Sequence, residues 1–365
     1  MPRVGIPEKE SGLMPKRHLE GATPEARAKA RQRLGTLKQL TVQPVTRIRY
    51  DQALQDFFRY LKEIGQILPT TAHDLDLVMA DYIEHLWATG AGRSTGSNVL
   101  AALQDAQPHS KGKLPQSWRL MKTWVINEIP NRAPPLPLEI LEAMVGYSLF
   151  KQQHLFALSL LVGFFGLLRT GEILTICASH VSVVSNKGPA VISLGLTKSG
   201  KRQGAAESVT IYVEDVCRRL FQWKAQVRST AKLTGAAHIW RKQFSDTLTA
   251  LKFHHLDFRP YSLRRGGSTH LFRQQGSLDR LTVVGRWQAA KTARLYVNEG
   301  LAVLAELSLV WNPFSRNLRN QYLRSLTSPL PKLEPTPKRV QGRGTWKAKK
   351  KQRNRGPKKG AHRVL

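Results

Sequence analysis

Three residues in well-separated segments carry side chains that together could act on a phosphate ester. Arg169 and Arg264 have forked guanidinium groups, which suit two-pronged contact with phosphate oxygens. Tyr296 has a hydroxyl that can attack phosphorus once its negative charge is stabilised. Such a set could cleave a nucleic-acid strand without a metal ion, because the arginines offset the charge that develops on the non-bridging oxygens.

The neighbours of each arginine favour this chemistry. Arg169 follows a long apolar run, so its charge lies at the edge of a predicted buried helix, and Glu172 is placed to hold its guanidinium group. Arg264 follows Pro-Tyr-Ser-Leu and precedes a second arginine and two glycines. Taken singly, either arginine also fits an ordinary ion pair on a helix surface. The hypothesis therefore depends on the two contexts together.

Tyr296 needs help to act as a nucleophile, because a free phenol has a pKa of about 10. By charge, Arg169, Arg264 and Arg294 are candidates to stabilise its phenolate. The alternative is a tyrosine packed in the core on an amphipathic helix, and spacing alone favours neither interpretation.

A lysine between two predicted strands could protonate the leaving oxygen. Lys198 is the candidate and Lys201 its close competitor, while a turn that only contacts phosphate is the alternative. The segment 195–201 also matches the start of a nucleotide-binding P-loop. However, Arg202 stands where that loop needs Ser or Thr, and a strand is predicted next, so ATP binding is not expected.

The sequence predicts neither a metal site nor a thiol site. Its 11 histidines are scattered, and adjacent His254 and His255 have no partner at a ligand-like spacing. Cys177 and Cys217 are the only cysteines and lie in apolar contexts, which favours an intracellular protein without disulfides. The longest apolar run, 155–168, is too short to cross a bilayer, and no signal-peptide pattern is present, so no membrane partner is expected.

The charge balance indicates a polyanionic partner. The 365 residues include 57 Lys and Arg against 25 Asp and Glu, a net charge of +32, which favours nucleic acid. Residues 338–365 contain 12 Lys and Arg and no acidic residue, so more than half of the excess lies elsewhere. The alternatives are a solvated charged face or a tail that binds non-specifically.

Composition and hydrophobic pattern divide the chain into five predicted parts. They are a basic flexible arm over 1–40, a small helical domain over 41–129, a proline-rich linker over 130–137, a second, mainly helical domain over 138–314 and a basic disordered tail over 315–365. The fold class is therefore mainly α, with two domains.

Apolar residues at helical spacing predict the elements of both domains. In the first domain, four helices are expected near 50–61, 75–87, 95–103 and 116–125, with Ser94 or Thr95 as the cap of the third. In the second, two short β-branched runs, 190–196 and 208–213, predict a small antiparallel sheet. Helices are expected around it at 138–147, 152–168, 214–232, 240–252, 264–275, 288–296 and 300–310.

At these segments the chain resembles the tyrosine recombinases, also called the phage-integrase family. Leu161–Leu174 is similar to the family's first arginine box, and Tyr261–Arg264 to its His-x-Leu-Arg box. Trp287 lies nine residues before Tyr296, where the family has His or Trp followed by its nucleophile. The resemblance covers about 138–300 and implies an integrase-like catalytic fold, and the helical part before it resembles the family's core-binding domain.

The resemblance implies a catalytic set made of Arg169, Lys198, Tyr261, Arg264, Trp287 and Tyr296, with Glu172 in support. Tyr261 stands where the family usually has His, and a tyrosine cannot serve as a base at neutral pH in the same way. Other basic residues near these segments are candidates to bind DNA phosphates: Lys201, Arg202, Arg265, Arg286 and Arg294.

The resemblance further implies what such a protein does. It would clamp double-stranded DNA, form a 3′-phosphotyrosine and a free 5′-hydroxyl without cofactors, and assemble as a tetramer on two duplexes. Site-specific recombination or DNA integration, for a mobile element, is the expected function. The cluster 347–359 would be a DNA-binding or nuclear-import tail. The alternatives are a type IB topoisomerase and a DNA-binding protein that has lost catalysis, the latter supported by Tyr261.

Overall fold

The computed structural model describes residues 23–32, 36–195, 197, 200, 205–310 and 312–326. This part of the chain is mostly helical and contains one three-stranded antiparallel sheet, which confirms the predicted fold class. None of the helices in these ranges is both long enough and apolar enough to cross a membrane.

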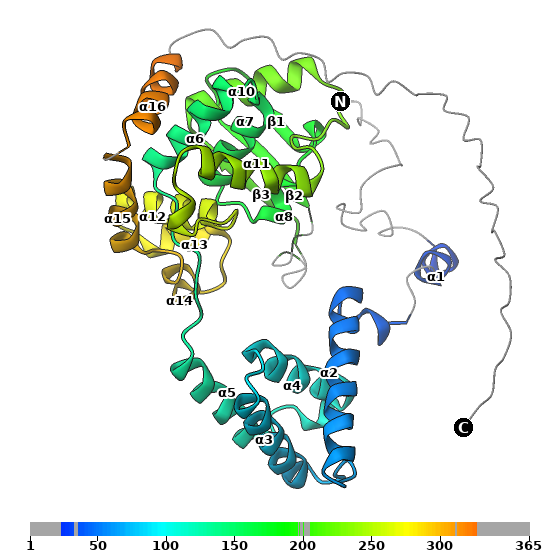
Figure 1. Cartoon of the computed structure of the whole chain (residues 1–365). Helices are drawn as coiled ribbons and strands as arrows, with labels where there is room; N and C mark the ends of the chain where they lie inside the picture. Colours follow the sequence, from blue (N-terminus) through cyan, green and yellow to red (C-terminus); the bar gives the residue numbers. More distant parts are fainter. Residues whose placement is uncertain are drawn as a thin grey trace, which may run out of the picture. The chain divides into compact units, whose positions relative to one another are not determined.

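The first helices form a bundle with its own core. After α1 (Pro24–Gln32) and the short turn η2 (Gln39–Thr41), the bundle helices are α2 (Pro44–Glu63), α3 (Ala72–Ala88), α4 (Arg93–Ala106) and α5 (Pro115–Asn127), with η3 (Pro108–Ser110) before the last (Figure 1). Their apolar faces meet at fully buried Phe57, Met79 and Leu100. These are the four helices that the apolar spacing predicts.

The ends of these helices follow from capping. Gly92, in extended conformation, precedes α4, so the expected cap at Ser94 or Thr95 is wrong, because both residues already lie in the first turn of the helix. Helix α5 begins at a buried carboxylate of α3. The side chain of Asp76 accepts hydrogen bonds from the backbone N–H groups of Gln116 and Ser117, at 2.8 and 3.0 Å. A negative charge at a helix N-terminus is stabilising.

The helix α7 (His154–Phe165) lies at the centre of the later part of the chain. Every residue from Phe156 to Phe164 is buried, as its continuous apolar sequence predicts. It packs on α6 (Leu138–Phe150) and on α12 (Ser262–Gln275). Gly267 makes the second contact possible, because a Cβ atom there would lie 2.1 Å from the carbonyl oxygen of Phe164. Helix α12, which contains Arg264, thus lies directly against the buried helix α7.

The sheet has the order β1–β2–β3, with β1 (Val181–Val183), β2 (Ala190–Gly195) and β3 (Glu207–Ile211). Strands β2 and β3 pair antiparallel, with Ile192 opposite Val209, which confirms the predicted hairpin. Strand β1, which the sequence does not predict, follows the turn η4 (Ala178–His180) and is only three residues long. The register shifts between Ser193 and Gly195, where the chain leaves the sheet towards the hairpin loop.

The remaining helices complete this part of the chain (Figure 1). They are α8 (Thr170–Ile173), α10 (Glu214–Gln226), α11 (Ala237–Ala250), the turn η5 (His254–Leu256), α13 (Leu278–Gly285), α14 (Ala290–Arg294), α15 (Glu299–Val310) and α16 (Pro313–Ser325). Helix α13 is not predicted by the sequence. The helix predicted over 288–296 is present only as the five-residue α14.

Helix α16 corrects the expected tail, because all but its first two residues lie within the range 315–365, for which the sequence predicts disorder. Asn312 caps it and Pro313 occupies its first turn. Its backbone passes so close to α6 that a Cβ atom on Gly146 would lie 2.2 Å from the carbonyl oxygen of Leu318. Arg319 also pairs with Glu142 at 2.6 Å. These contacts with distant residues outweigh the polar, basic composition of the segment.

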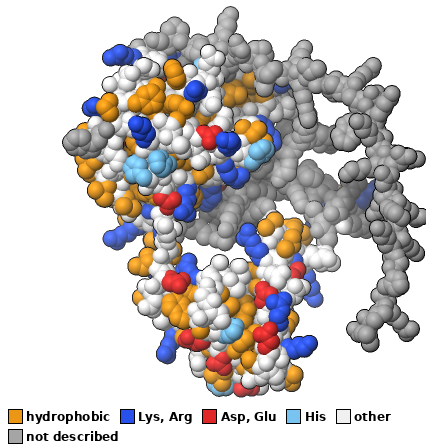
Figure 2. All heavy atoms as spheres, viewed as in Figure 1, with side chains coloured by type: hydrophobic (Ala, Val, Ile, Leu, Met, Phe, Trp, Pro, Cys, Tyr) orange, Lys and Arg blue, Asp and Glu red, His pale blue; other side chains and the backbone are white. Residues whose placement is uncertain are grey.

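Figure 2 shows Lys and Arg side chains spread over the visible face, among hydrophobic and acidic ones. The positive charge of the described residues is therefore not confined to one end of the chain, as the sequence predicts.

Candidate active site

Arg169 caps the short helix α8 and is held by Glu172 of the same helix. The carboxylate accepts a hydrogen bond from the Arg169 guanidinium at 2.7 Å and one from its backbone N–H at 2.8 Å. The sequence analysis expected this pairing. The chain turns here through Leu167, whose φ of 46° is left-handed, so Arg169 leaves the apolar helix and its side chain stays partly exposed.

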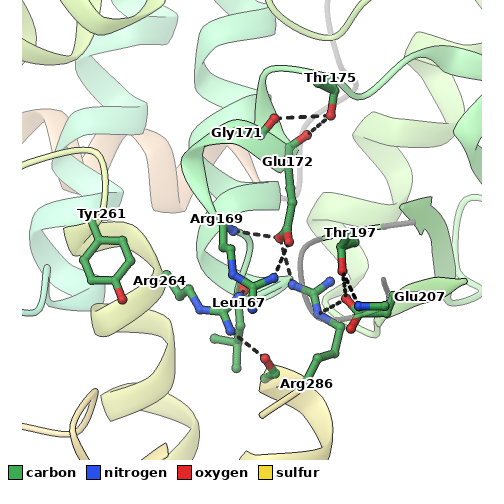
Figure 3. A network of polar contacts seen from close by, with 12 residues as sticks. Leu167, Arg169, Gly171, Glu172, Thr175, Thr197, Glu207, Tyr261, Arg264 and Arg286 are labelled. Atoms are coloured by element: carbon green, nitrogen blue, oxygen red, sulfur yellow. Dashed lines mark hydrogen bonds and ion pairs between the residues drawn. The ribbon is translucent and has the colours of Figure 1, made fainter. Parts of the chain in front are cut away.

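Arg286 joins the same carboxylate from the other side. Its guanidinium donates to Glu172 at 2.8 Å and approaches Glu207 at 3.6 Å, and its side chain is only 8% exposed. Arg286 ends α13 with a left-handed φ of 58°. In Figure 3 the guanidinium groups of Arg169, Arg264 and Arg286 come together below Glu172. The charge of Arg286 is thus used within the protein, whereas the sequence analysis placed it among DNA-phosphate binders.

Glu207, which the sequence analysis missed, ties this network to the hairpin. It opens β3, and its carboxylate accepts a hydrogen bond from the Thr197 hydroxyl at 2.6 Å. That hydroxyl in turn accepts from the backbone N–H of Gly200 at 3.1 Å. The predicted residues Lys198, Lys201 and Arg202 belong to this loop and lie outside the described residues. The position of Glu207, an acidic residue directly before the second predicted strand and after a lysine-bearing loop, is the sequence feature from which its role could have been predicted.

Opposing charges set the protonation of Glu172. Burial alone would raise the pKa of this carboxyl, but the charge of Arg286, the backbone hydrogen bond of Arg169 and the charge of Arg169 together lower the pKa below its usual value. Glu172 is therefore ionised at neutral pH and serves as the shared anion between two arginines.

Arg264 projects from α12 and has no exposed surface. Its two terminal nitrogens donate to the backbone carbonyls of Leu167 and Gly285, at 2.5 and 2.6 Å, and its Nε has no partner among the described residues. Burial and the positive charges of Arg169 and Arg286 lower the pKa of Arg264 to about 10, so it remains charged at neutral pH. Three guanidinium groups therefore concentrate positive charge in one place.

Trp287 and Tyr296 cover this charge. The Arg264 guanidinium lies 4.6 Å from the Trp287 ring and 5.4 Å from the Tyr296 ring, within the range of cation–π attraction. The two rings contact each other with centroids 4.4 Å apart. Gly285 leaves room for the indole, because a Cβ atom there would lie 1.8 Å from it. This contact gives a physical reason for the Gly-Arg-Trp sequence.

The indole N–H of Trp287 is buried and meets no partner at hydrogen-bonding geometry among the described residues. Its dipole is one of the influences that lower the pKa of Tyr296, whose ring contacts the indole. Such a donor is free to bind an oxygen atom brought in by a substrate.

Tyr296 accepts a hydrogen bond of 2.5 Å from the hydroxyl of Tyr261, the N-cap residue of α12. Burial would raise the pKa of Tyr296, but the bond from Tyr261 and the charges of Arg264 and Arg169 outweigh burial and lower it. Burial and the donated hydrogen bond raise the pKa of Tyr261, so this residue keeps its proton. Tyr261 is thus a hydrogen-bond donor to Tyr296 and not a base.

An open pocket lies beside the two tyrosines. It is lined by Asn131, Arg132, Ala133, Arg259, Tyr261, Arg265, Thr292, Leu295 and Tyr296. Arg265 lies in this pocket, next to Arg264 in sequence. Arg294, a further predicted phosphate binder, is exposed at the end of α14. The structure therefore brings five predicted residues to one place, namely Arg169, Tyr261, Arg264, Trp287 and Tyr296.

A metal site is absent from the described ranges, in which no group of three or more His, Cys, Asp or Glu side chains could hold an ion. Cys177 and Cys217 are both free thiols.

No protein-family model and no curated protein matches this chain. Solved structures do. The XerH site-specific recombinase bound to difH substrate is 14% identical, with 72% of this chain and 79% of the other covered at a TM-score of 0.47. The Tn1549 transposon integrase in complex with transposon right end DNA is 12% identical, with 78% and 97% covered at 0.49. XerA recombinase is 12% identical, with 72% and 99% covered at 0.37.

The neighbours are recombinases and an integrase.

Proposed function

We propose that this chain cleaves and rejoins DNA strands through a covalent ester between Tyr296 and a DNA phosphate. The observation that carries the proposal is the environment of the Tyr296 hydroxyl. It accepts a hydrogen bond from Tyr261, its ring lies over the buried guanidinium of Arg264, and its pKa is lowered. A tyrosine that only packs in a core has no need of such charge.

In the proposed reaction, the Tyr296 oxygen attacks phosphorus, and the bond from phosphorus to the 5′-oxygen breaks. The phenol proton passes to solvent, and the leaving 5′-oxygen takes a proton, for which Lys198 of the hairpin loop is the proposed donor. Arg169, Arg264 and the Trp287 N–H would stabilise the charge on the non-bridging oxygens. Rejoining is the reverse, so the bond energy is retained and no ATP is needed.

A movement of Tyr296 belongs to this proposal. Arg264 has no exposed surface, and the rings of Trp287 and Tyr296 lie against it. A phosphate can reach this guanidinium only if Tyr296 swings away from it. The same swing would bring the hydroxyl from its bond with Tyr261 towards the DNA strand.

The substrate would be double-stranded DNA, for which the net charge of +32 and the DNA complexes of the structural neighbours give support. The proposed role is site-specific recombination or integration for a mobile element, by a tetramer on two duplexes. Residues 315–365 would provide a basic DNA-binding or nuclear-import segment beyond α16. The proposed division at 41–129 and 138–314 gives one DNA-binding and one catalytic domain.

A second candidate is a DNA-binding protein without catalysis. Two observations favour it, namely Tyr261 where the family usually has His and the complete burial of Arg264 with both terminal nitrogens bound to carbonyls. The two candidates differ in one measurable property, covalent attachment to DNA.

The test is a trapping assay on nicked duplexes of random sequence, labelled at one end. A nick near the attacked phosphate lets the short 5′-hydroxyl fragment diffuse away, so the covalent complex accumulates. We expect a labelled protein band on a denaturing gel with the wild type and none with Tyr296→Phe, which should still bind DNA. Peptide mapping of the adduct should locate the DNA on Tyr296.

Tyr261→Phe is the matched control, because its hydroxyl lies 2.5 Å from that of Tyr296. Attachment that maps to Tyr261, or equal attachment by the wild type and Tyr296→Phe, would contradict the assignment. DNA binding without attachment in the wild type would establish the second candidate.

A further inference from the structure

Arg265 is a buried arginine that has no counter-ion in the part of the chain that the structure describes. It is 5% exposed, and its Nε has no hydrogen-bond partner among the described residues. Within the same ranges, no acidic side chain forms an ion pair with it, in contrast to Arg169 and Arg286, which share Glu172. A buried charge that lacks a partner is costly, and an anionic ligand could supply that partner.

The pocket that Arg265 lines combines apolar and aromatic side chains with three arginines. Arg132 and Arg259 also line it, and none of its lining residues is acidic. Arg259 is held at the rim by Asp257 at 2.9 Å. Burial lowers the pKa of Arg265, and the charge of Arg132 lowers it further, while Tyr261 and Tyr296 partly offset this effect. The net lowering agrees with a site that lacks negative charge. Forked arginine donors favour phosphate among anions.

The pocket is also distinct from the cluster that would hold the attacked phosphate. Tyr296 belongs to both places, because its ring lies 5.4 Å from the Arg264 guanidinium and its side chain also lines the pocket, whereas Arg169, Arg264 and Arg286 do not line it. Arg264 and Arg265 are adjacent in sequence. Arg264 donates to the carbonyls of Leu167 and Gly285, whereas the side chain of Arg265 lines the pocket.

We propose that this pocket, lined by Arg132, Arg259 and Arg265, is a second phosphate site that holds the DNA phosphate next to the one that Tyr296 attacks. This inference rests on the proposed function for the identity of the neighbouring phosphate. The site would fix the register of the strand, so that Tyr296 faces one phosphate and not the next. Arg265 is then a binding residue, not a catalytic one.

The experiment measures DNA binding without cleavage, in full-length Tyr296→Phe protein. Arg265→Met keeps the volume of the side chain and removes its charge. Affinity for a fluorescent 30-base-pair duplex is measured by anisotropy at several salt concentrations. We expect the slope of log affinity against log salt to fall in magnitude by about 0.9, the value for one phosphate contact, with a loss of roughly tenfold in affinity at low salt.

Lys242→Met is the control, because it also removes one positive charge, on an exposed side chain of α11, which lines no part of the pocket. Its slope and affinity should stay close to those of the parent. Arg265→Lys, which restores the charge without the fork, should recover the slope but only part of the affinity. If Arg265→Met does not fold, the comparison uses Arg132→Met on the wall of the same pocket.

A second arm separates a DNA phosphate from free phosphate. NMR of ¹⁵N-labelled arginine side chains follows the Nε–H signal of Arg265 as inorganic phosphate or duplex DNA is added at constant ionic strength. We expect a saturable shift with both, and none with chloride. A shift with inorganic phosphate but not with DNA would overturn the role in strand register, and a shift with neither would overturn the site.

Failure of this inference is distinguishable from failure of the proposed function. If no covalent complex is trapped but Arg265→Met loses one phosphate contact, the pocket is supported as a DNA-binding site and the proposed strand cleavage is wrong. If trapping succeeds and Arg265→Met binds like its parent at every salt concentration, the second site is wrong and the mechanism stands.

Discussion

Two clusters of arginines lie near Tyr296, and they differ in how their charge is balanced. In the first cluster, Arg169 and Arg286 share the carboxylate of Glu172. In the second cluster, Arg265 is buried in a pocket lined by two more arginines and by no acidic residue. Arginines that are paired within the protein hold elements in place, whereas a buried arginine left unpaired is available to an external anion.

The difference depends on residues far away in the sequence. Arg265 directly follows Arg264 and Arg286 directly precedes Trp287, so the sequence predicts that both bind DNA phosphates. Only the fold brings Glu172 and Glu207 to Arg286 and leaves Arg265 without either. The following predictions test this contrast, beginning with the largest effect.

Removal of the shared carboxylate should destabilise the protein most. Glu172→Gln keeps the shape of the side chain but leaves Arg169 and Arg286 without the charge between them. We expect the free energy of unfolding to fall by about 3 kcal/mol, as when one partner of a buried ion pair is removed. Denaturant unfolding of the full chain measures it.

The control is Asp246→Asn, which breaks the exposed pair of Asp246 with Lys242 and should cost under about 0.5 kcal/mol. Equal losses in the two variants would show that the buried network contributes no more than a surface pair, and the contrast between the clusters would fail.

Acid should weaken the same network. The pKa of Glu172 is below its usual value of 4.5 in the folded chain, so its contribution to stability is complete above about pH 4.5 and is lost as the pH falls through the folded pKa. The difference in unfolding free energy between the wild type and Glu172→Gln should therefore shrink below pH 4.5. A difference that stays constant down to pH 3 would contradict this assignment.

The hydrogen bond between the tyrosines should affect rate more than stability. Tyr261→Phe removes a donor that lowers the pKa of Tyr296, so that pKa should rise. Loss of one such bond should slow covalent attachment about tenfold at neutral pH. Part of the rate should return at higher pH. The pH dependence of trapping measures this, with Tyr212→Phe, on an exposed side chain, as the control.

Arg294→Ala should have the smallest effect. This arginine is exposed at the end of α14, so the free energy of unfolding should change by less than about 0.5 kcal/mol. The salt dependence of DNA binding should change less than in Arg265→Met. A larger change at Arg294 than at Arg265 would reverse the proposed order of the two arginines.

The sequence was sufficient for features that depend on local pattern. Helical spacing predicted the bundle helices, the buried α7 and α12, and β-branched runs predicted the hairpin. The pairing of Arg169 with Glu172 was also expected, because the two residues are three apart on one helical turn.

The features that the sequence left out depend on distant partners. Strand β1 is three residues long and exists because it pairs with β2. Helix α16 is polar and basic, and its stability comes from α6. Glu207 is an ordinary acidic residue in the sequence, and only the hairpin geometry brings it to Thr197 and Arg286.

The contact of Gly266, in α12, with the linker residue Leu136 has a mechanical consequence. A Cβ atom on Gly266 would lie 1.8 Å from the carbonyl oxygen of Leu136, and the N–H of Leu136 donates to the carbonyl of Ser262 at 3.1 Å. The end of the proline-rich linker is thus packed against α12 and hydrogen-bonded to it. Any hinge between the bundle and the rest of the chain must lie before Leu136, and tension along the linker would be transmitted to the helix that carries Arg264 and Arg265.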